Sequence, residues 1–346
     1  MKKITLLLVV FVTLGVLAGC GSSKETLNVF GPSVYIDDEN LKIFEEENNV
    51  RVRYETFASN EEMYTKLQGG DKFDILIPSD YMIERLIEEE AILPLDLTKI
   101  TNYDGIIDGL KVLDFDNGNK YHIPYFWGTV GITYNTKNVD IKDLEEQGWN
   151  ILKNTKYKSR LFIYNSERDA FMTALKALGY SANTTDEGQL QQAYDWLVEQ
   201  KQTMDAVYVT DEVINGMKGG SRDLAIMYSG DATDVIFENE DMDFFMPNEG
   251  TNVWVDGMVI SKDAKNVELA TKWINFMINE EQAELNALEV GYTPVVQATF
   301  DKLKDGEFEG IHSFVPRLGY EKDETFRHNE ALRKKISELW ERVILQ

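Results

Sequence analysis

Cysteine and histidine are scarce in this sequence of 346 residues, which contains one cysteine and three histidines. A single cysteine cannot form a disulfide within the chain, so the fold must depend on its hydrophobic core alone. His122, His312 and His328 show none of the spacings that metal sites use, and no second cysteine supports them. We therefore expect neither a metal centre nor a cofactor.

Enzyme signatures are also missing. The sequence contains no G-x-S-x-G nucleophile motif, no Walker phosphate loop and no glycine fingerprint of dinucleotide-binding folds. No pair of carboxylates stands out as a catalytic couple, but acidic residues are so numerous that a secreted hydrolase stays open as an alternative. The sequence favours a protein that is not an enzyme.

Positive charge is in short supply, because 35 Lys and Arg residues stand against 60 Asp and Glu residues, giving a net charge of −25. This balance argues against binding to nucleic acids and against electrostatic attachment to anionic lipids. Two interpretations of the acidic excess stay open. It can serve solubility alone, or it can create a field that attracts cations.

Only one long uncharged apolar run occurs, at residues 4–17, directly after two lysines. It is too short for a comfortable membrane span and, with the small residues that follow, has the pattern of a secretory signal peptide over residues 1–19. Cys20 stands immediately after the triplet Leu-Ala-Gly, which resembles the bacterial lipobox, whose cysteine is acylated and becomes the mature N-terminus. An ordinary signal peptide followed by a chance cysteine is the alternative.

A lipidated Cys20 has three consequences for the mature protein. Removal of residues 1–19 deletes two lysines and no acid, which takes the net charge from −25 to −27. Residues 20–26 then form a polar linker, and no run after it reaches transmembrane length. We expect a soluble, extracytoplasmic body that touches the membrane through its N-terminal lipid only.

Strand-like and helix-like segments alternate along the rest of the chain, which is typical of an α/β fold with mostly parallel sheets. Ser59 followed by Glu62 gives one helix start the pattern of a capping box. The length of the chain favours two lobes. The predicted strands cover residues 27–30, 50–57, 73–78, 159–164, 223–228 and 252–260, and the clearest predicted helices cover residues 59–68, 268–278 and 329–344.

The segment GTVGITYNTK (128–137) is apolar and contains two glycines, and it lies between the first series of strands and helices and the second. We expect it to be a strand that crosses from one lobe to the other. Such a crossing can act as a hinge, because a few residues at its ends absorb the motion of the lobes.

The stretch NVWVDGMVI (252–260) places a carboxylate inside an apolar, β-branched run. Side chains alternate along a strand, so Trp254 and Asp256 share one face. A buried, unpaired carboxylate is unfavourable, so a cationic ligand that supplies the counter-charge would explain Asp256.

Other aromatic and acidic side chains follow predicted strands, at the end where open α/β sheets bind ligands. Rings and carboxylates together suit a cation with an aliphatic body, through cation–π contacts and charge-assisted hydrogen bonds. Taken singly, each ring is better explained as core and each acid as a solvated loop residue, but together at strand ends they favour a binding site. The residues are Ser33, Tyr35, Ser79, Asp80, Tyr81, Asp169, Tyr228 and Asp231.

From about residue 27 to the C-terminus the chain resembles the bacterial spermidine/putrescine-binding proteins, the solute receptors of polyamine ABC importers. The most similar passages are YETFASNEEMYTKL (54–67), FDILIPSDYMIERL (73–86), YHIPYFWGTVGITYN (121–135), LGYSANTTD (178–186), PNEGTNVWVDGMVISKDAKN (247–266), INFMI (274–278) and VGYTP (290–294). This set of motifs is more specific than a general likeness to binding proteins.

The resemblance implies an α/β, two-lobed periplasmic-binding-protein-like fold of type II, with a ligand cleft between lobes joined by crossing hinge strands. On this basis we expect lobe 1 to comprise residues 27–131 and 254–300, and lobe 2 to comprise residues 132–253 and 301–346. The ligand-binding residues carried over by motif are Ser33, Tyr35, Ser79, Tyr81, Asp169, Tyr228, Trp254, Asp256, Tyr292 and Arg327.

Three positions depart from the family pattern. Pro32 replaces a frequent tryptophan, and Ser166 replaces what is a second acid in some members, with Glu167 beside it as a possible substitute. Arg327 aligns with a polar glutamine. If Arg327 faces the site it would repel a polyamine, and if the local alignment is shifted it lies on the surface.

The resemblance implies a monomeric, lipid-anchored receptor that binds putrescine or spermidine and delivers it to the permease of an ABC importer. No nucleic acid is expected as a partner. The departures keep two alternatives open: a receptor of the same fold for another amine, an amino acid or an anion, and, more remotely, a secreted hydrolase.

Overall fold

The computed structural model describes residues 24–346. The predicted signal peptide and the lipidated Cys20 lie outside these described residues. The strands are β1 Thr26–Pro32, β2 Arg51–Phe57, β3 Ile75–Leu76, β4 His122–Asn135, β5 Leu161–Tyr164, β6 Val207–Val209, β7 Leu224–Tyr228, β8 Met242–Phe245, β9 Val253–Ile260 and β10 Thr293–Pro294. The α-helices are α1 Asp38–Asn48, α2 Asn60–Gln68, α3 Asp80–Glu88, α4 Ile141–Gln147, α5 Glu167–Ala177, α6 Glu187–Met204, α7 Glu212–Lys218, α8 Ser229–Glu238, α9 Val267–Met277, α10 Glu280–Val290, α11 Gln297–Lys304 and α12 Glu330–Ile344.

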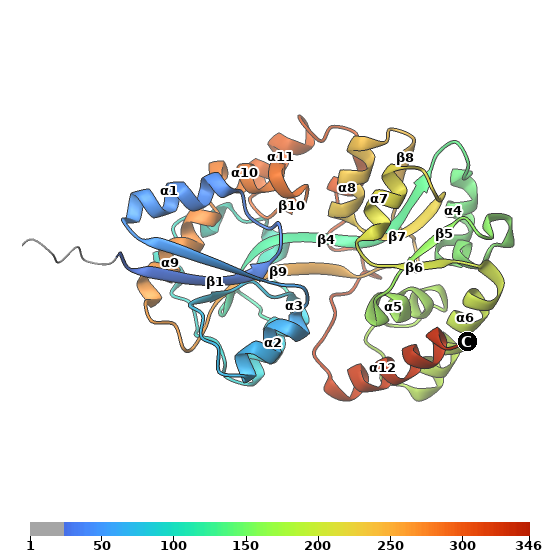
Figure 1. The fold of residues 1–346 in the computed structure, drawn as a ribbon, viewed down its shortest axis with the longest axis horizontal. Coiled ribbons are helices and arrows are strands. Elements are labelled where there is room, and N and C mark those ends of the chain that lie inside the picture. The colour runs from blue at the N-terminus through green and yellow to red at the C-terminus, as the bar shows by residue number, and fades with distance from the viewer. Residues whose placement is uncertain (1–23) are drawn as a thin grey trace, which may run out of the picture.

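The strands form one continuous sheet in the order β2-β1-β3-β9-β4-β7-β5-β6, with β8 and β10 also paired to β4. The long strand β4 joins the two halves of the molecule (Figure 1). Its residues up to Thr129 pair with β9, and its residues from Val130 pair with β7. The predicted crossing over residues 128–137 therefore corresponds to the second half of a strand that serves both halves.

The prediction of mostly parallel sheets is only half right. Strand pairs that do not involve β4 or β9 are parallel, as between β1 and β2 or between β5 and β7. Every pair that involves β4 or β9 is antiparallel. The difference arises because these two strands run between the halves rather than belonging to a repeated strand–helix–strand unit.

Two lobes are visible, one at each end of the crossing strands β4 and β9 (Figure 1). We call lobe 1 the half that contains β1–β3 and helices α1–α3 and α9–α11, and lobe 2 the half that contains β5–β8, helices α4–α8 and α12. Helix α12 is the last element and packs on α5 and α6 of lobe 2. The chain therefore passes between the lobes a third time, after α11. The residue boundaries proposed from the resemblance remain a proposal.

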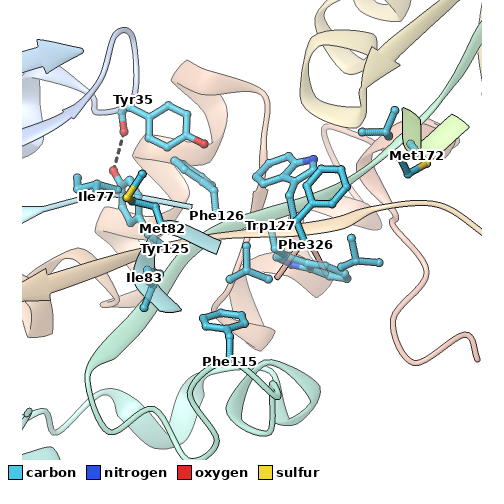
Figure 2. Close-up of a cluster of buried hydrophobic side chains, with 14 of the residues drawn as sticks. Tyr35, Ile77, Met82, Ile83, Phe115, Tyr125, Phe126, Trp127, Met172 and Phe326 are labelled. Atoms are coloured by element: carbon cyan, nitrogen blue, oxygen red, sulfur yellow. Dashed lines mark hydrogen bonds between the residues drawn. The ribbon is translucent and has the colours of Figure 1, made fainter. Parts of the chain in front are cut away.

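The core continues from lobe 1 into lobe 2 along β4. Phe126 and Trp127 are 1% and 2% exposed and lie between Tyr35 of lobe 1 and Met172 of lobe 2 (Figure 2). A second, smaller cluster lies inside lobe 2, between β7 and the helices α7 and α8. Among residues 24–346 no helix combines the length and the apolar character needed to cross a membrane.

Candidate ligand-binding site

Asp256 lies in the middle of β9, where it is 7% exposed and opposite Phe126 of β4. The other edge of β9 pairs with β3 of lobe 1, and next to this pairing an isolated bridge joins Asp256 to Ser79. The hydroxyl of Tyr35 donates a hydrogen bond to Asp256 Oδ2. Burial raises the pKa of the Asp256 carboxyl, and hydrogen bonds from Ser79 and Tyr35 offset part of that rise.

Tyr35 is held in place by a hydrogen bond to its backbone and by contacts of its ring. It follows β1, and its carbonyl oxygen accepts a hydrogen bond of 2.7 Å from the hydroxyl of Tyr125 on β4 (Figure 2). Its ring packs edge-on against Phe126 and Tyr292. The residue is 6% exposed, so its hydroxyl reaches Asp256 in a fixed geometry.

Asp169 is the counterpart of Asp256 in lobe 2 and lies in the first turn of α5. Ser166 caps this helix, because its hydroxyl oxygen accepts from the backbone N–H of Asp169 at 3.4 Å. The hydroxyl of Tyr228 donates to Asp169 Oδ2 at 2.7 Å, whereas the buried Oδ1 has no hydrogen-bond partner in the described chain. Burial raises the pKa of the Asp169 carboxyl, and the Tyr228 and Ser166 hydrogen bonds oppose that rise.

Aromatic rings connect the two acids. The centroids of Tyr35 and Tyr292 are 5.7 Å apart, those of Tyr292 and Trp254 are 5.3 Å apart, and those of Trp254 and Tyr228 are 6.3 Å apart. Tyr164 continues the series beyond Tyr228. We call this series the aromatic chain, and it runs from the acid of β9 to the acid of α5.

Two glycines make room for the aromatic chain. A Cβ atom at Gly230 would lie 1.5 Å from a ring carbon of Tyr292, and one at Gly128 would lie 2.4 Å from a ring carbon of Trp254. Any larger residue would displace the ring. Neither glycine was among the predicted site residues, because nothing in the sequence indicates which ring will lie against which backbone.

Asp231 is a further acid of the site, which the sequence places at the end of a predicted strand but which is not among the residues carried over by motif. It lies in the first turn of α8, and the hydroxyl of Tyr292 donates to its Oδ1 at 2.8 Å, which joins lobe 2 to the loop before β10. Burial raises the pKa of Asp231 to about 6, although the Tyr292 hydrogen bond lowers it. The sequence indicates Asp231 by its position three residues after Tyr228, at the end of a predicted strand.

Asp80 also belongs to the surroundings of the site. It is the first residue of α3 and 1% exposed, and its Oδ1 accepts from the backbone N–H of Tyr81 at 2.6 Å. Burial raises its pKa well above the ordinary range, and its interaction with the nearby charge of Asp256 adds to the rise. The lobe-1 end of the site therefore holds two neighbouring carboxyls.

The remaining predicted residues are more peripheral. Ser33 is exposed on the loop after β1, and Tyr81 is half-buried at the start of α3. Arg327 makes an ion pair with Glu84 of α3, with its Nε 2.9 Å from Oε1. Its guanidinium is therefore bound to a lobe-1 carboxylate at an edge of the interlobe region.

The chain that holds these buried acids and aromatic rings is similar to a known protein family. Residues 40–307 match the family model described as bacterial extracellular solute-binding protein. The chain belongs to this family. Bacterial extracellular solute-binding proteins bind solutes outside the cytoplasm and are not a class of enzymes, which agrees with the predicted absence of catalytic motifs.

Relatives of this solute-binding protein have more specific names. It is 31% identical to the spermidine/putrescine-binding periplasmic protein of Salmonella typhimurium over 305 residues, which cover 88% of this chain and 86% of the relative. It is 29% identical to the putrescine/cadaverine-binding protein of Pseudomonas aeruginosa, with both chains covered completely. The family resemblance inferred from the motifs is thereby confirmed.

A solved structure supports the same placement. The substrate-binding protein of the spermidine/putrescine ABC transporter from Streptococcus pneumoniae superposes with a TM-score of 0.82 at 35% identity. The match covers 93% of this chain and 99% of that chain. The predicted two-lobed α/β fold is confirmed by this agreement.

Proposed function

We propose that this protein is an extracytoplasmic receptor that binds a polyamine such as putrescine or spermidine and delivers it to an ABC importer. The observation that carries the proposal is the aromatic chain with a buried carboxylate at each end, Asp256 and Asp169. The names of the relatives point to the same ligand class.

The chemistry of the aromatic chain suits a linear polyamine. Methylene groups pack against the ring faces, and ammonium groups gain cation–π attraction of about 0.5–2 kcal/mol at each favourable ring. The free Oδ1 of Asp169 offers an acceptor for a charge-assisted hydrogen bond. Asp231 adds a carboxylate next to Tyr292, so that a cation between the two ends meets negative charge as well.

The surroundings of the three positions that depart from the family pattern are compatible with a polyamine ligand. The charge of Arg327 is compensated by Glu84, so it does not stand free to repel a cation. Ser166 caps α5, which gives it a structural role beside Asp169. Pro32 ends β1 in register with Phe57 of β2, and removal of a ring there leaves the aromatic chain from Tyr35 onward intact.

The location follows from the family and the N-terminal sequence together. The family is extracytoplasmic, and the lipobox-like motif at Cys20 supports a lipid anchor on the membrane. We expect a monomer that presents its closed, ligand-bound form to the permease subunits. Palmitate release or mass spectrometry of the mature N-terminus tests the anchor, and replacement of Cys20 by Ser should leave the protein free in solution.

Titration calorimetry and thermal shift test the ligand. A ligand that binds only the folded state raises the melting temperature, so putrescine and spermidine should each be tried alongside amino acids and anions. We expect stabilisation by a polyamine only. Stabilisation by an amino acid or an anion, with none by polyamines, would favour the alternative receptor, and turnover of a generic ester, glycoside or peptide substrate would favour the hydrolase.

The substitution Asp256→Ala tests the site itself. We expect at least a tenfold loss of polyamine affinity, because a desolvated charge pair loses one partner. Asp241→Asn is the control, since Asp241 pairs with Lys137 on the surface of lobe 2. Unchanged affinity in Asp256→Ala would refute the assignment of the site.

A further inference from the structure

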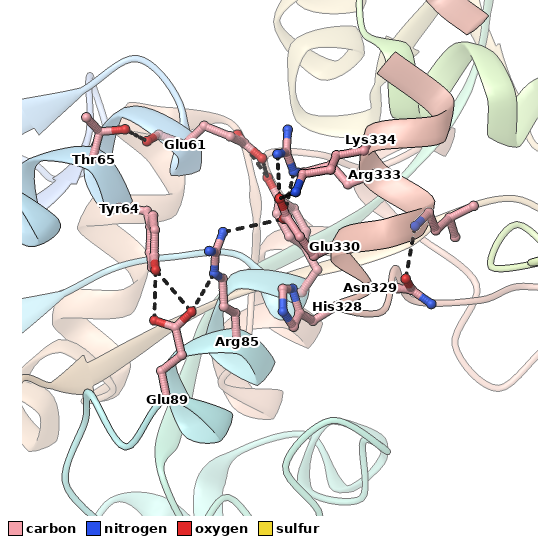
Figure 3. A network of polar contacts seen from close by, with 12 residues as sticks. Glu61, Tyr64, Thr65, Arg85, Glu89, His328, Asn329, Glu330, Arg333 and Lys334 are labelled. Atoms are coloured by element: carbon pink, nitrogen blue, oxygen red, sulfur yellow. Dashed lines mark hydrogen bonds and ion pairs between the residues drawn. The ribbon is translucent and has the colours of Figure 1, made fainter. Parts of the chain in front are cut away.

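Charged residues from both lobes meet along one edge of the interlobe region (Figure 3). We call this group the interlobe clasp. Lobe 1 contributes the helices α2 and α3, and lobe 2 contributes the start of α5 and the segment that leads into α12. The charged members are Glu61, Glu84, Arg85 and Glu88 of lobe 1 with Arg168, Arg327, His328 and Glu330 of lobe 2, and the ring of Tyr81 lies against Arg168.

The strongest contact of the clasp joins Arg327 to Glu84. The guanidinium Nε lies 2.9 Å from Oε1 and 3.1 Å from Oε2 of Glu84, and the terminal nitrogen reaches Oε1 as well. The backbone N–H of His328 donates to Oε2 at 2.6 Å. The Glu84 side chain is 13% exposed and the Arg327 side chain is 42% exposed, so solvent screens this pair mainly from the arginine side.

Arg327 is firmly attached to lobe 2 through its own backbone. Its N–H donates to Asn183 Oδ1 at 2.9 Å, and Asn183 donates in turn to the carbonyl of Thr325. Glu324 pairs with the buried Lys176 of α5 and accepts from Ser181. The Arg327–Glu84 pair therefore links a fixed point of lobe 2 to a helix of lobe 1.

Arg168 makes the inner contact of the clasp. Its guanidinium lies 3.9 Å from the ring centroid of Tyr81 and 3.8 Å from a carboxylate oxygen of Glu61, both in lobe 1. Because the next residue along α5 is Asp169, this contact places the lobe-2 end of the site directly against lobe 1. Closure of the clasp and completion of the site are therefore geometrically coupled.

The outer contacts are longer. An Arg85 nitrogen lies 3.9 Å from Glu330, and a His328 nitrogen lies 3.8 Å from Glu88. Arg85 is positioned within its own lobe, over the ring of Tyr64 at 3.6 Å and against Glu89 at 2.9 Å (Figure 3). These pairs add charge complementarity but less binding free energy than Glu84 and Arg327.

From these contacts we infer that the interlobe clasp holds the two lobes closed and raises ligand affinity without touching the ligand. Each clasp contact joins opposite lobes, so it exists only when the lobes are together. Interactions confined to one state shift the population toward that state, and the apparent affinity rises with the fraction of receptor that is binding-competent. Glu84, Arg168 and Arg327 are thus positioning residues. The inference rests on the proposed function for its ligand.

A double-mutant cycle tests the clasp. Polyamine affinity is measured by calorimetry for the parent, Glu84→Gln, Arg327→Gln and the double variant, and small-angle scattering gives the radius of gyration of each with and without polyamine. We expect each single variant to bind about three- to tenfold more weakly. The double variant should lose little more than either single variant, because both remove the same pair.

The matched control is Glu284→Gln, which removes the partner of Lys302, 2.6 Å away, in an ion pair within lobe 1. It should leave both affinity and scattering unchanged. An additive cycle, or clasp variants whose affinity and radius of gyration match the parent's, would overturn the inference. If the parent binds no polyamine, the proposed function fails. In that case scattering alone tests the inference about the clasp. A larger radius of gyration for the clasp variants than for the parent supports the inference, and an equal radius of gyration refutes it.

Discussion

The two ends of the site carry the same pair of groups, an aspartate and a tyrosine hydroxyl, but hold them differently. Asp256 sits in the middle of β9, between β4 and the bridge to Ser79, and the hydroxyl of Tyr35 donates to it. Asp169 sits in the first turn of α5 and keeps one oxygen without a partner.

Because of this difference, we expect the two carboxylates to contribute differently to ligand binding. The strand end already accepts a hydrogen bond from Tyr35 at Oδ2, so its carboxylate is held in place before any ligand arrives. The helix end has an unfilled acceptor, and the positive end of the α5 macrodipole favours its ionised form. A ligand ammonium would gain most at Asp169, because it removes the penalty of a buried, unpaired oxygen.

The largest effect should therefore follow from Asp169→Asn. We expect about a hundredfold loss of polyamine affinity, against about tenfold for Asp256→Asn, since truncation of a buried charge pair costs about 2–5 kcal/mol and each 1.4 kcal/mol is tenfold. Calorimetry on the two variants measures the ratio directly. Equal losses, or a larger loss at Asp256, would show that the free oxygen of Asp169 does not dominate binding.

Gly230→Ala tests the middle of the aromatic chain. The new methyl group would lie within 1.8 Å of two ring carbons of Tyr292, so the ring must move away from Asp231 and Trp254. We expect about a tenfold loss of affinity and about 1–3 kcal/mol of destabilisation from overpacking. Melting curves and calorimetry measure the two effects.

The chain offers a close control for this substitution. Gly188 is the second residue of α6, as Gly230 is of α8, and a Cβ there meets only an Asp186 oxygen at 3.0 Å. Gly188→Ala should keep the affinity and leave stability equal or slightly higher, because alanine favours the helix. If Gly230→Ala behaves like Gly188→Ala, the packing of Tyr292 against α8 is not needed for binding.

Because of Asp231, we expect acidification to raise the stability of the protein and to lower its affinity for the ligand. Its folded pKa of about 6 exceeds the ordinary value of 3.8, so its contribution to stability is fully present below pH 3.8 and is lost as the pH rises through 6. Polyamine binding needs the ionised carboxylate. On acidification from pH 7 to pH 5, Asp231 should therefore stabilise the ligand-free protein while it weakens affinity by a few-fold.

The variant Asp231→Asn isolates this group from the other buried acids. Asp80, Asp169 and Asp256 also have raised pKa values and should keep part of the pH dependence in the variant. We expect a shallower change of affinity with pH than in the parent, measured by calorimetry at several pH values. Identical slopes would assign the whole pH dependence to the other three acids.

Much of the fold could be read from local pattern. The predicted helices at residues 268–278 and 329–344 correspond to Val267–Met277 and Glu330–Ile344, because their amphipathic periodicity is local information. The strand predicted over 73–78 is only Ile75–Leu76 in the structure. The flanking Asp74 and Ile77 are buried and donate their backbone N–H groups to Asn28 and Phe30 of β1, so the contact with β1 extends beyond the two residues assigned to the strand.

The site was predictable only in part, and for a physical reason. Alternation alone puts Trp254 and Asp256 on one face of a strand. The bond from Tyr35 to Asp256, however, joins residues 221 positions apart, so their strand-end positions and the family resemblance placed both in the site but no local pattern paired them. Gly230 and Arg168 were missed because their roles depend on which lobe-1 ring or acid faces them across the interface, and Asp231 was recognised only as a strand-end acid, without its partner Tyr292.

The smallest expected effect concerns the Ser166 cap of α5, which helps to position Asp169. Ser166→Ala removes the cap of α5, and loss of such a cap typically costs about 1 kcal/mol of stability. Because the capped N–H belongs to Asp169 itself, we also expect a two- to threefold loss of affinity by calorimetry. Asp186→Ala removes the cap of α6 in the same lobe and should lower stability similarly with affinity unchanged. If both variants lose stability alone, Asp169 is positioned by Tyr228 rather than by its helix, and the two ends of the site are more alike than their secondary structures suggest.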